Sequence, residues 1–169
     1  MSRAFVKELD DKLDEIDLPE RPQIEHINYM TLHGLEQMKH LLEDLRRQHA
    51  KLKEQEDKLS VKNQIKPLEA EIRYYEKRIQ RAIPIDISTQ STEDIRFGAT
   101  VELVNGEDER YSFMIVGEDE ADAERGLISW ITPLARALIA KQGGDCVIWQ
   151  RPAGDMELEV LSFGYKNIE

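Results

Sequence analysis

The sequence has few of the features that mark membrane, secreted or redox proteins. Its 169 residues include one cysteine and 7% aromatic residues, and no apolar run approaches the roughly 20 residues that cross a bilayer. Its first residues are too acidic and too poor in apolar side chains for a signal peptide. Cys146 lies in the apolar run Cys-Val-Ile-Trp, which predicts a buried, inert thiol. We expect a cytoplasmic protein with no membrane partner.

Proline and glycine are missing from a long central stretch. Beyond Gly34 the next glycine is Gly98, and beyond Thr31 the first proline is Pro67. Apolar positions there recur at alternating spacings of three and four, which indicates two heptad seams. They run along Leu35, Met38, Leu42, Leu45, His49 and Leu52, and along Val61, Ile65, Leu68, Ile72, Tyr75, Ile79 and Ala82. Two adjacent seams predict an antiparallel coiled-coil hairpin over residues 30–83, which begins after an N-cap at Thr31.

The tip of this hairpin is expected at about residues 56–64. Because proline suits the first turn of a helix, one interpretation begins the regular second arm at Pro67 and makes residues 58–66 a looser tip.

Basic residues are scarce outside the hairpin. Residues 31–83 carry 12 basic and 9 acidic side chains, whereas residues 84–169 carry 7 and 17. An acidic C-terminal unit is a poor surface for phosphate backbones and suits a basic partner surface better.

The C-terminal part changes to a period of two, which is typical of strands. Strands are expected over 99–104 and 111–116 around an Asn105-Gly106 turn, and over 127–131, 145–150 and 156–163. A short helix over 134–141 should follow Pro133 and end at Gly143-Gly144, and the acidic loop Glu118 to Glu124 is interpreted as solvated or as a partner surface. The predicted fold class is α+β, with a flexible acidic leader (1–29), the hairpin (30–83), a polar linker (84–96) and a C-terminal domain (97–169) that forms a mostly antiparallel sheet with one short helix.

Several motifs in the C-terminal domain resemble the bacterial Gre transcript cleavage factors in order and spacing. They are Phe97-Gly98-Ala99-Thr100-Val101-Glu102, Ile115-Val116-Gly117-Glu118-Asp119-Glu120-Ala121-Asp122, Gly126-Leu127-Ile128-Ser129, Thr132-Pro133-Leu134-Ala135-Arg136-Ala137-Leu138, Gly144-Asp145 and Pro152-Ala153-Gly154. Tyr29-Met30-Thr31 before Gly34-Leu35 resembles the start of the family's coiled coil, and Met1 to Val6 resembles the GreB-like branch.

The resemblance implies a transcription elongation regulator. It implies an FKBP-like C-terminal domain that docks at the rim of the secondary channel of RNA polymerase core, while the coiled coil enters the channel. It assigns partner binding to Ser129, Ile131, Thr132 and Pro133. It also implies no cofactor of the protein's own, no autonomous enzymatic activity and a monomeric chain.

The hairpin tip departs from the family pattern. In cleaving members, two tip carboxylates help to hold a second Mg²⁺ in the polymerase's active centre, within a motif of Asp, two residues including Ser, and then Glu-Asn. That motif is absent here. Glu54, Glu56 and Asp57 stand in its place among lysines 51, 53, 58, 62 and 66. The resemblance then makes Glu56 and Asp57 the accessory catalytic residues and adds Glu54 as a third candidate ligand for the shared Mg²⁺.

Three interpretations of the tip stay open. The carboxylates form a solvated face, or they support cleavage near the nascent RNA 3′ end, or the tip blocks the channel and antagonises other channel-binding factors, as non-cleaving relatives do. Each arm is about one heptad shorter than expected for cleaving members, which removes roughly 10 Å of reach. A coiled-coil adaptor that binds another protein is the alternative from a different class.

Overall fold

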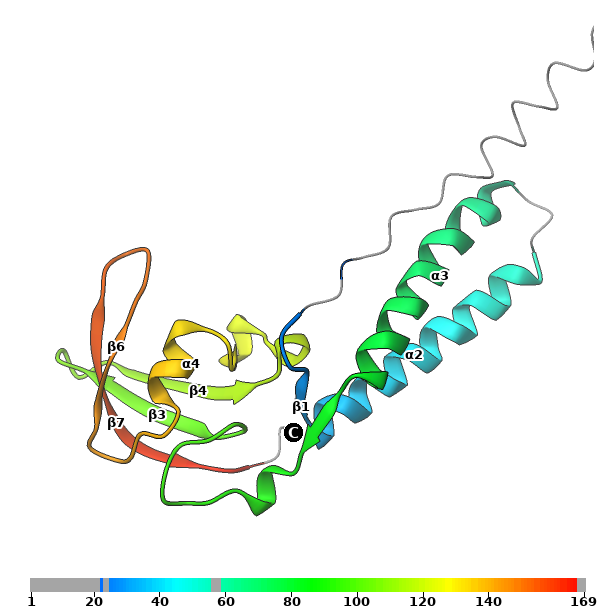
Figure 1. Ribbon diagram of the computed structural model, residues 1–169. Coiled ribbons are helices and arrows are strands. Elements are labelled where there is room, and N and C mark those ends of the chain that lie inside the picture. Colours follow the sequence, from blue (N-terminus) through cyan, green and yellow to red (C-terminus); the bar gives the residue numbers. More distant parts are fainter. Residues whose placement is uncertain (1–21, 23–24, 56–58, 167–169) are drawn as a thin grey trace, which may run out of the picture. The chain divides into compact units, whose positions relative to one another are not determined.

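The structure is a computed structural model that describes residues 22, 25–55 and 59–166 (Figure 1). Contacts divide the described chain into two units, residues 42–55 with 59–77, and residues 25–41 with 78–166. The elements in chain order are β1 (Tyr29–Thr31), α2 (Leu32–Lys53), α3 (Leu59–Gln80), β2 (Ile83–Ile85), η1 (Ile87–Thr89), β3 (Thr100–Asn105), β4 (Arg110–Val116), η2 (Glu118–Glu120), η3 (Ala123–Arg125), β5 (Leu127–Ser129), α4 (Pro133–Leu138), β6 (Cys146–Trp149) and β7 (Met156–Gly164). None of the described helices is long and apolar enough to cross a membrane.

The first unit is formed by the antiparallel arms of α2 and α3, as the heptad seams predict. Arg46 pairs with Glu76 at 2.6 Å, and His49 Nε2 lies 2.9 Å from Glu69 Oε1, so partner numbers fall along α3 as they rise along α2. The buried side chains of this unit are Leu42, Val61, Ile65, Leu68 and Tyr74. All but Tyr74 lie on the predicted seams.

Pro67 lies inside α3 and does not begin it. The interpretation of residues 58–66 as a looser tip is therefore wrong for residues 59–66, which are helical. Proline inside a helix costs about 3 kcal/mol, but α3 buries Val61, Ile65 and Leu68 around this position. Because burying a large apolar side chain contributes about 1.5–3 kcal/mol, these three contacts outweigh the cost of the proline.

The second unit is built on a five-stranded sheet in the order β5-β4-β3-β7-β6. Its pairs are antiparallel except β4–β5, which is parallel, because the chain between them passes through η2 and η3 instead of a tight turn. The α4 residues Leu134, Ala135 and Leu138 share one buried cluster with sheet residues such as Leu103 and Val160. The α+β fold and the hairpin around Asn105 are confirmed.

The helix α4 ends at Leu138, earlier than the expected stop at Gly143-Gly144. Ala140 adopts a left-handed conformation, with φ of 66°. Its N–H donates to the Ile95 carbonyl at 2.7 Å, and the Ile95 N–H donates to the Lys141 carbonyl at 2.8 Å. These two bonds to a distant segment replace the next helical turn.

Cys146 is exposed, so the prediction of a buried thiol is wrong. It lies on the edge strand β6, where it alternates with buried Val147. Successive side chains of a strand point to opposite faces, and an apolar run on an edge strand covers the core with only every second residue.

A two-stranded parallel sheet lies at the base of the hairpin, within the second unit. Tyr29 of β1 pairs with Ile83 of β2, and Thr31 pairs with Ile85. The Ile83 N–H also donates to the Asn28 carbonyl at 2.8 Å. The entry to α2 and the exit from α3 are thereby joined.

Candidate functional site

The predicted partner-binding residues lie on one short segment, residues 129–133, which we call the docking loop. β5 sets its position, because Ser129 pairs with Val116 and the Trp130 N–H donates to the Val116 carbonyl at 2.9 Å. Ser129 is buried, Ile131 and Thr132 are half-buried, and Pro133 is exposed. Ser129 is therefore the residue of the loop that is least accessible to a partner, and Pro133 is the most accessible.

Thr132 gives the loop a fixed shape. Its hydroxyl donates to the Ser129 carbonyl at 2.8 Å and accepts from the Ala135 N–H at 3.4 Å, which makes it the N-cap of α4. Pro133 occupies the first turn, where its missing N–H costs nothing, as predicted.

Trp130 joins the docking loop to the base of the hairpin. Its ring lies edge-on to the Tyr29 ring, with centroids 5.2 Å apart at 67°. The indole Nε1 is buried without a hydrogen-bond partner among the described residues. No sequence pattern indicated this contact, since the two aromatic residues are distant in the chain.

The three acidic residues of η2, Glu118 to Glu120, are called the acidic turn. The Glu120 carboxylate accepts from the N–H groups of Thr31 and Gly117, each at 3.0 Å, and from the Thr31 hydroxyl. The Thr31 hydroxyl oxygen also accepts from the Gly34 N–H at 2.9 Å, so the predicted N-cap is confirmed. A Cβ on Gly34 would lie 2.0 Å from Glu120 Oε1. Glycine at this position makes room for the carboxylate.

Arg78, near the end of α3, is 1% exposed. Its Nε donates to Asp119 Oδ2 at 2.7 Å, and its Nη2 donates to Asn28 Oδ1 at 2.6 Å. The Asn28 amide returns a bond to the Arg78 carbonyl at 2.9 Å. His26 Nδ1 lies 3.5 Å from Glu118 Oε1.

The acidic turn is therefore not a solvated loop. The interpretation of residues 118–124 as solvated is wrong for Glu118 to Glu120, whose carboxylates meet His26, Arg78 and Thr31 in turn. The alternative interpretation as a partner surface stays a prediction. A charged run is often solvent-facing, and nothing local in the sequence argued against that interpretation. The burial of Arg78 near the end of α3, which would have done so, is visible only in the structure.

The candidate tip residues are only partly within the described chain. Glu54 is exposed in the turn that follows α2, while Glu56 and Asp57 lie outside the described residues. Lys51, Lys53 and Lys62 are exposed. Within the described ranges no group of three or more His, Cys, Asp or Glu side chains is placed to hold a metal ion.

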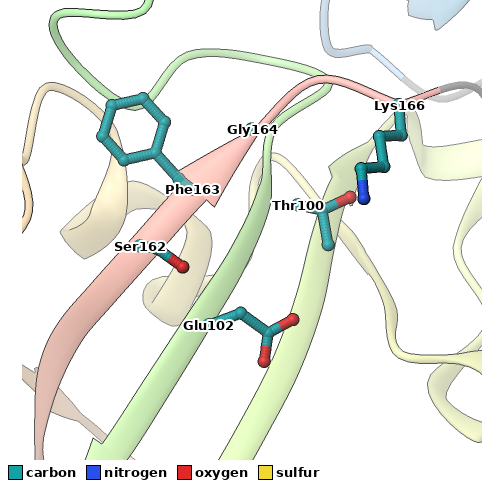
Figure 2. A pocket seen from close by; sticks show the side chains of 6 residues that line it. All are labelled: Thr100, Glu102, Ser162, Phe163, Gly164 and Lys166. Atoms are coloured by element: carbon teal, nitrogen blue, oxygen red, sulfur yellow. The ribbon is translucent and has the colours of Figure 1, made fainter.

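An open hollow of about 200 Å³ lies on the sheet between β3 and β7. Figure 2 shows its six lining residues, with the Glu102 carboxylate and the Lys166 ammonium among them. Glu102 already accepts from the Ser112 hydroxyl at 2.6 Å. Nothing in the sequence indicated this hollow.

Comparison with known proteins identifies the family. The family described as "Transcription elongation factor, GreA/GreB, C-term" matches residues 90–165. A transcription elongation factor GreA of Xylella fastidiosa (strain M12) is 35% identical over 167 residues, which cover 98% of this chain and 96% of that protein. The chain belongs to the GreA/GreB family. It is a Gre-type transcription elongation factor.

The two branches of the Gre family both give strong matches. GreA of Pseudomonas syringae is 46% identical over 112 residues, covering 65% of this chain and 71% of the relative. GreB of Neisseria meningitidis serogroup A is 39% identical over 114 residues, covering 67% and 70%. The expected GreB-like branch is therefore not resolved.

Among solved structures, GreA factor homolog 1 of Thermus thermophilus is 26% identical, with a TM-score of 0.40. The match covers 82% of this chain and 99% of that one. The Gre family match over residues 90–165 includes both the docking loop and the acidic turn, whereas the hairpin tip lies outside it.

Proposed function

We propose that this Gre-type factor binds RNA polymerase core through its docking loop and presents its hairpin tip to the secondary channel. There it modulates elongating or backtracked complexes, as a monomer in the cytoplasm. The observation that carries the proposal is the family match over residues 90–165, which includes the loop. The factor has no autonomous activity in this proposal.

The docking loop suits a protein interface. Thr132 fixes its backbone through two bonds, so little conformational entropy is lost on binding. Pro133 is exposed and Ile131 half-buried, which offers an apolar contact on a rigid support. Residues 84–169 carry 17 acidic and 7 basic side chains, and this charge favours a basic rim on the partner.

Binding is tested by competition against a labelled copy of the wild-type chain on purified core polymerase. We expect Ile131→Ala to weaken binding about 10-fold or more, because it removes the apolar anchor without adding a charge that a basic rim would attract. Ile148→Ala is the matched control, because Ile148 is 49% exposed on β6 and its truncation should change affinity by no more than about twofold.

Absence of wild-type binding to the polymerase, or equal losses in the two variants, would overturn the proposal. A stable 2:2 helical assembly without polymerase affinity would favour the coiled-coil adaptor instead.

A second candidate is assistance to Mg²⁺-dependent transcript cleavage by the polymerase. Carboxylates are the donors that Mg²⁺ prefers, and Glu54 is exposed next to the tip, so Glu54, Glu56 and Asp57 are of the right chemical type to complete a shared site. The exposed lysines 51, 53 and 62 oppose metal recruitment and favour occupancy of the channel without cleavage.

The two roles of the tip differ in the products of backtracked complexes incubated with Mg²⁺. Short 3′ RNA fragments that disappear in the Glu56→Ala, Asp57→Ala double variant would establish assisted cleavage. Inhibition of elongation without such fragments would establish channel occupancy.

A further inference from the structure

We propose that the acidic turn is a positioning device for both ends of the hairpin. Glu120 binds the first turn of α2, and Asp119 binds Arg78 in the last turn of α3. Its effect on transcription rests on the proposed function, whereas its bonds are a property of the free chain. Glu120 and Asp119 are thus positioning residues, which act through the groups of the chain that they bind.

Glu120 is bound where the charge of a helix favours it. Its carboxylate accepts three hydrogen bonds, two from Thr31 and one from Gly117. The N-terminus of a helix carries about half a positive charge, and Thr31 is the N-cap of α2. Gly34 removes the side chain that would meet the carboxylate.

The other end of the hairpin is bound by an ion pair that water does not screen. Arg78 is 1% exposed, and the Asp119 side chain is 12% exposed. A buried guanidinium is strongly destabilising without its counter-ion. Asn28 bonds to the Arg78 side chain and to its backbone carbonyl, so this arginine has little freedom to point elsewhere.

The acidic turn and the docking loop share a support. Val116, the last residue of β4, accepts from the Trp130 N–H at 2.9 Å, and Gly117 and the acidic turn follow it directly in the chain. A partner bound at Ile131 to Pro133 is thereby connected through one strand end to the groups that bind α2 and α3. Docking and hairpin placement therefore use one strand end as a common support, through different side chains.

The test compares Glu120→Ala with Glu76→Ala in the full chain. The control removes the carboxylate of the Arg46–Glu76 pair, whose side chains are 56% and 43% exposed. Three quantities are measured: hydrogen exchange of the Thr31 amide in the free chain, affinity for core polymerase, and the effect of a saturating amount of the factor on stalled elongation complexes.

In Glu120→Ala, we expect Thr31 amide exchange to rise about 10-fold or more, because its acceptor is lost. Affinity should stay within about threefold, because the docking loop is intact. The effect of a saturating amount of the factor on stalled elongation complexes should fall about 10-fold or more, because a small misplacement of a functional group is enough to cause a loss of that size. Glu76→Ala should leave all three within about twofold of wild type.

Unchanged Thr31 exchange, or an unchanged saturating effect, would overturn the inference. A loss of affinity as large as the loss of effect would also overturn it, because docking and positioning would then not be separable. Glu120→Gln, which keeps one acceptor oxygen, replaces Glu120→Ala if the alanine variant does not fold. If the wild type fails to bind polymerase, the proposed function fails, and Thr31 exchange still decides whether Glu120 holds the hairpin base.

Discussion

Replacing Gly34 by alanine should destabilise the protein, although alanine favours helix over glycine. The propensity gain is about 0.5–1 kcal/mol. Against it, the new Cβ would lie 2.0 Å from Glu120 Oε1, 2.3 Å from Cδ and 2.6 Å from Cγ. Carbon atoms in contact need about 3.5–4.0 Å, so the carboxylate must move by more than 1 Å.

The cost of that movement is set by the bonds that Glu120 makes. Three donors meet its carboxylate, and a hydrogen bond to a charged group contributes a net of about 1.5–3 kcal/mol. Losing or stretching two of them costs about 3 kcal/mol by the same figures, which leaves a net loss of about 2 kcal/mol after the propensity gain. A loss of that size lowers the melting temperature by about 4–8 °C in a protein of this length.

The assay is a double-mutant cycle that combines Gly34→Ala with Glu120→Ala, and denaturant unfolding measures the stability of each variant. Without the carboxylate there is nothing for the new methyl to displace, so Gly34→Ala should stabilise that background by about 0.5–1 kcal/mol. Gly143→Ala is the matched control, because its Cβ would have 3.8 Å to its nearest neighbour and should change stability by no more than about 0.5 kcal/mol. Stabilisation by Gly34→Ala in both backgrounds would show that the Glu120 carboxylate does not oppose a methyl group at residue 34.

Three further predictions concern the second unit. Ala140→Gly should raise the free energy of unfolding by about 0.5–1 kcal/mol, because Ala140 has φ of 66° and glycine adopts this conformation without strain; denaturant unfolding measures it. Cys146 is exposed, so a thiol reagent should label the native protein as fast as the urea-unfolded chain, and protection in the native state would contradict the exposed edge strand. Burial raises the pKa of Tyr165 above 10.0, while Arg96 has a smaller lowering effect and Asp94 a smaller raising effect. The stability that the neutral Tyr165 side chain contributes is therefore complete below pH 10 and is lost as the pH rises through the raised pKa. Between pH 9 and about 11.5, the Tyr165→Phe variant should therefore lose less stability than the wild type.

Periodic features of the fold could be predicted from the sequence. The seams that include Leu42, Ile65 and Leu68 indicated two antiparallel helices, because burial of a helical stripe repeats every three or four residues. The N-cap at Thr31 and the first-turn proline at Pro133 were local signals, and local signals survive folding.

The contacts that were missed are non-local and polar. Glu120 bonds to Thr31 from 89 residues away, and Arg78 bonds to Asp119 from 41 residues away. No spacing rule connects such pairs, so the acidic turn had the pattern of a solvated loop. The two strands at the hairpin base have three residues each, which is too few for any alternation to be visible.

The remaining errors have a shared cause. The expectations for Pro67 and Ala140 both rested on local propensity. Burial of apolar residues on either side of Pro67 keeps that segment helical, whereas backbone hydrogen bonds with Ile95 end the helix before Ala140. Propensity is outweighed where tertiary contacts are stronger. At the candidate tip, Glu54 lies in the turn that follows α2, while the roles of Glu54, Glu56 and Asp57 stay predictions.

In the proposed function, this Gre-type factor acts on RNA polymerase through its docking loop. The decisive experiment titrates the full chain and its Ile131→Ala variant into defined stalled elongation complexes and records transcript lengths. We predict a saturable change in read-through or cleavage, with the half-maximal concentration about 10-fold or more higher for Ile131→Ala and the same plateau. No change at any concentration, or the same half-maximal concentration for both chains, would contradict the claim.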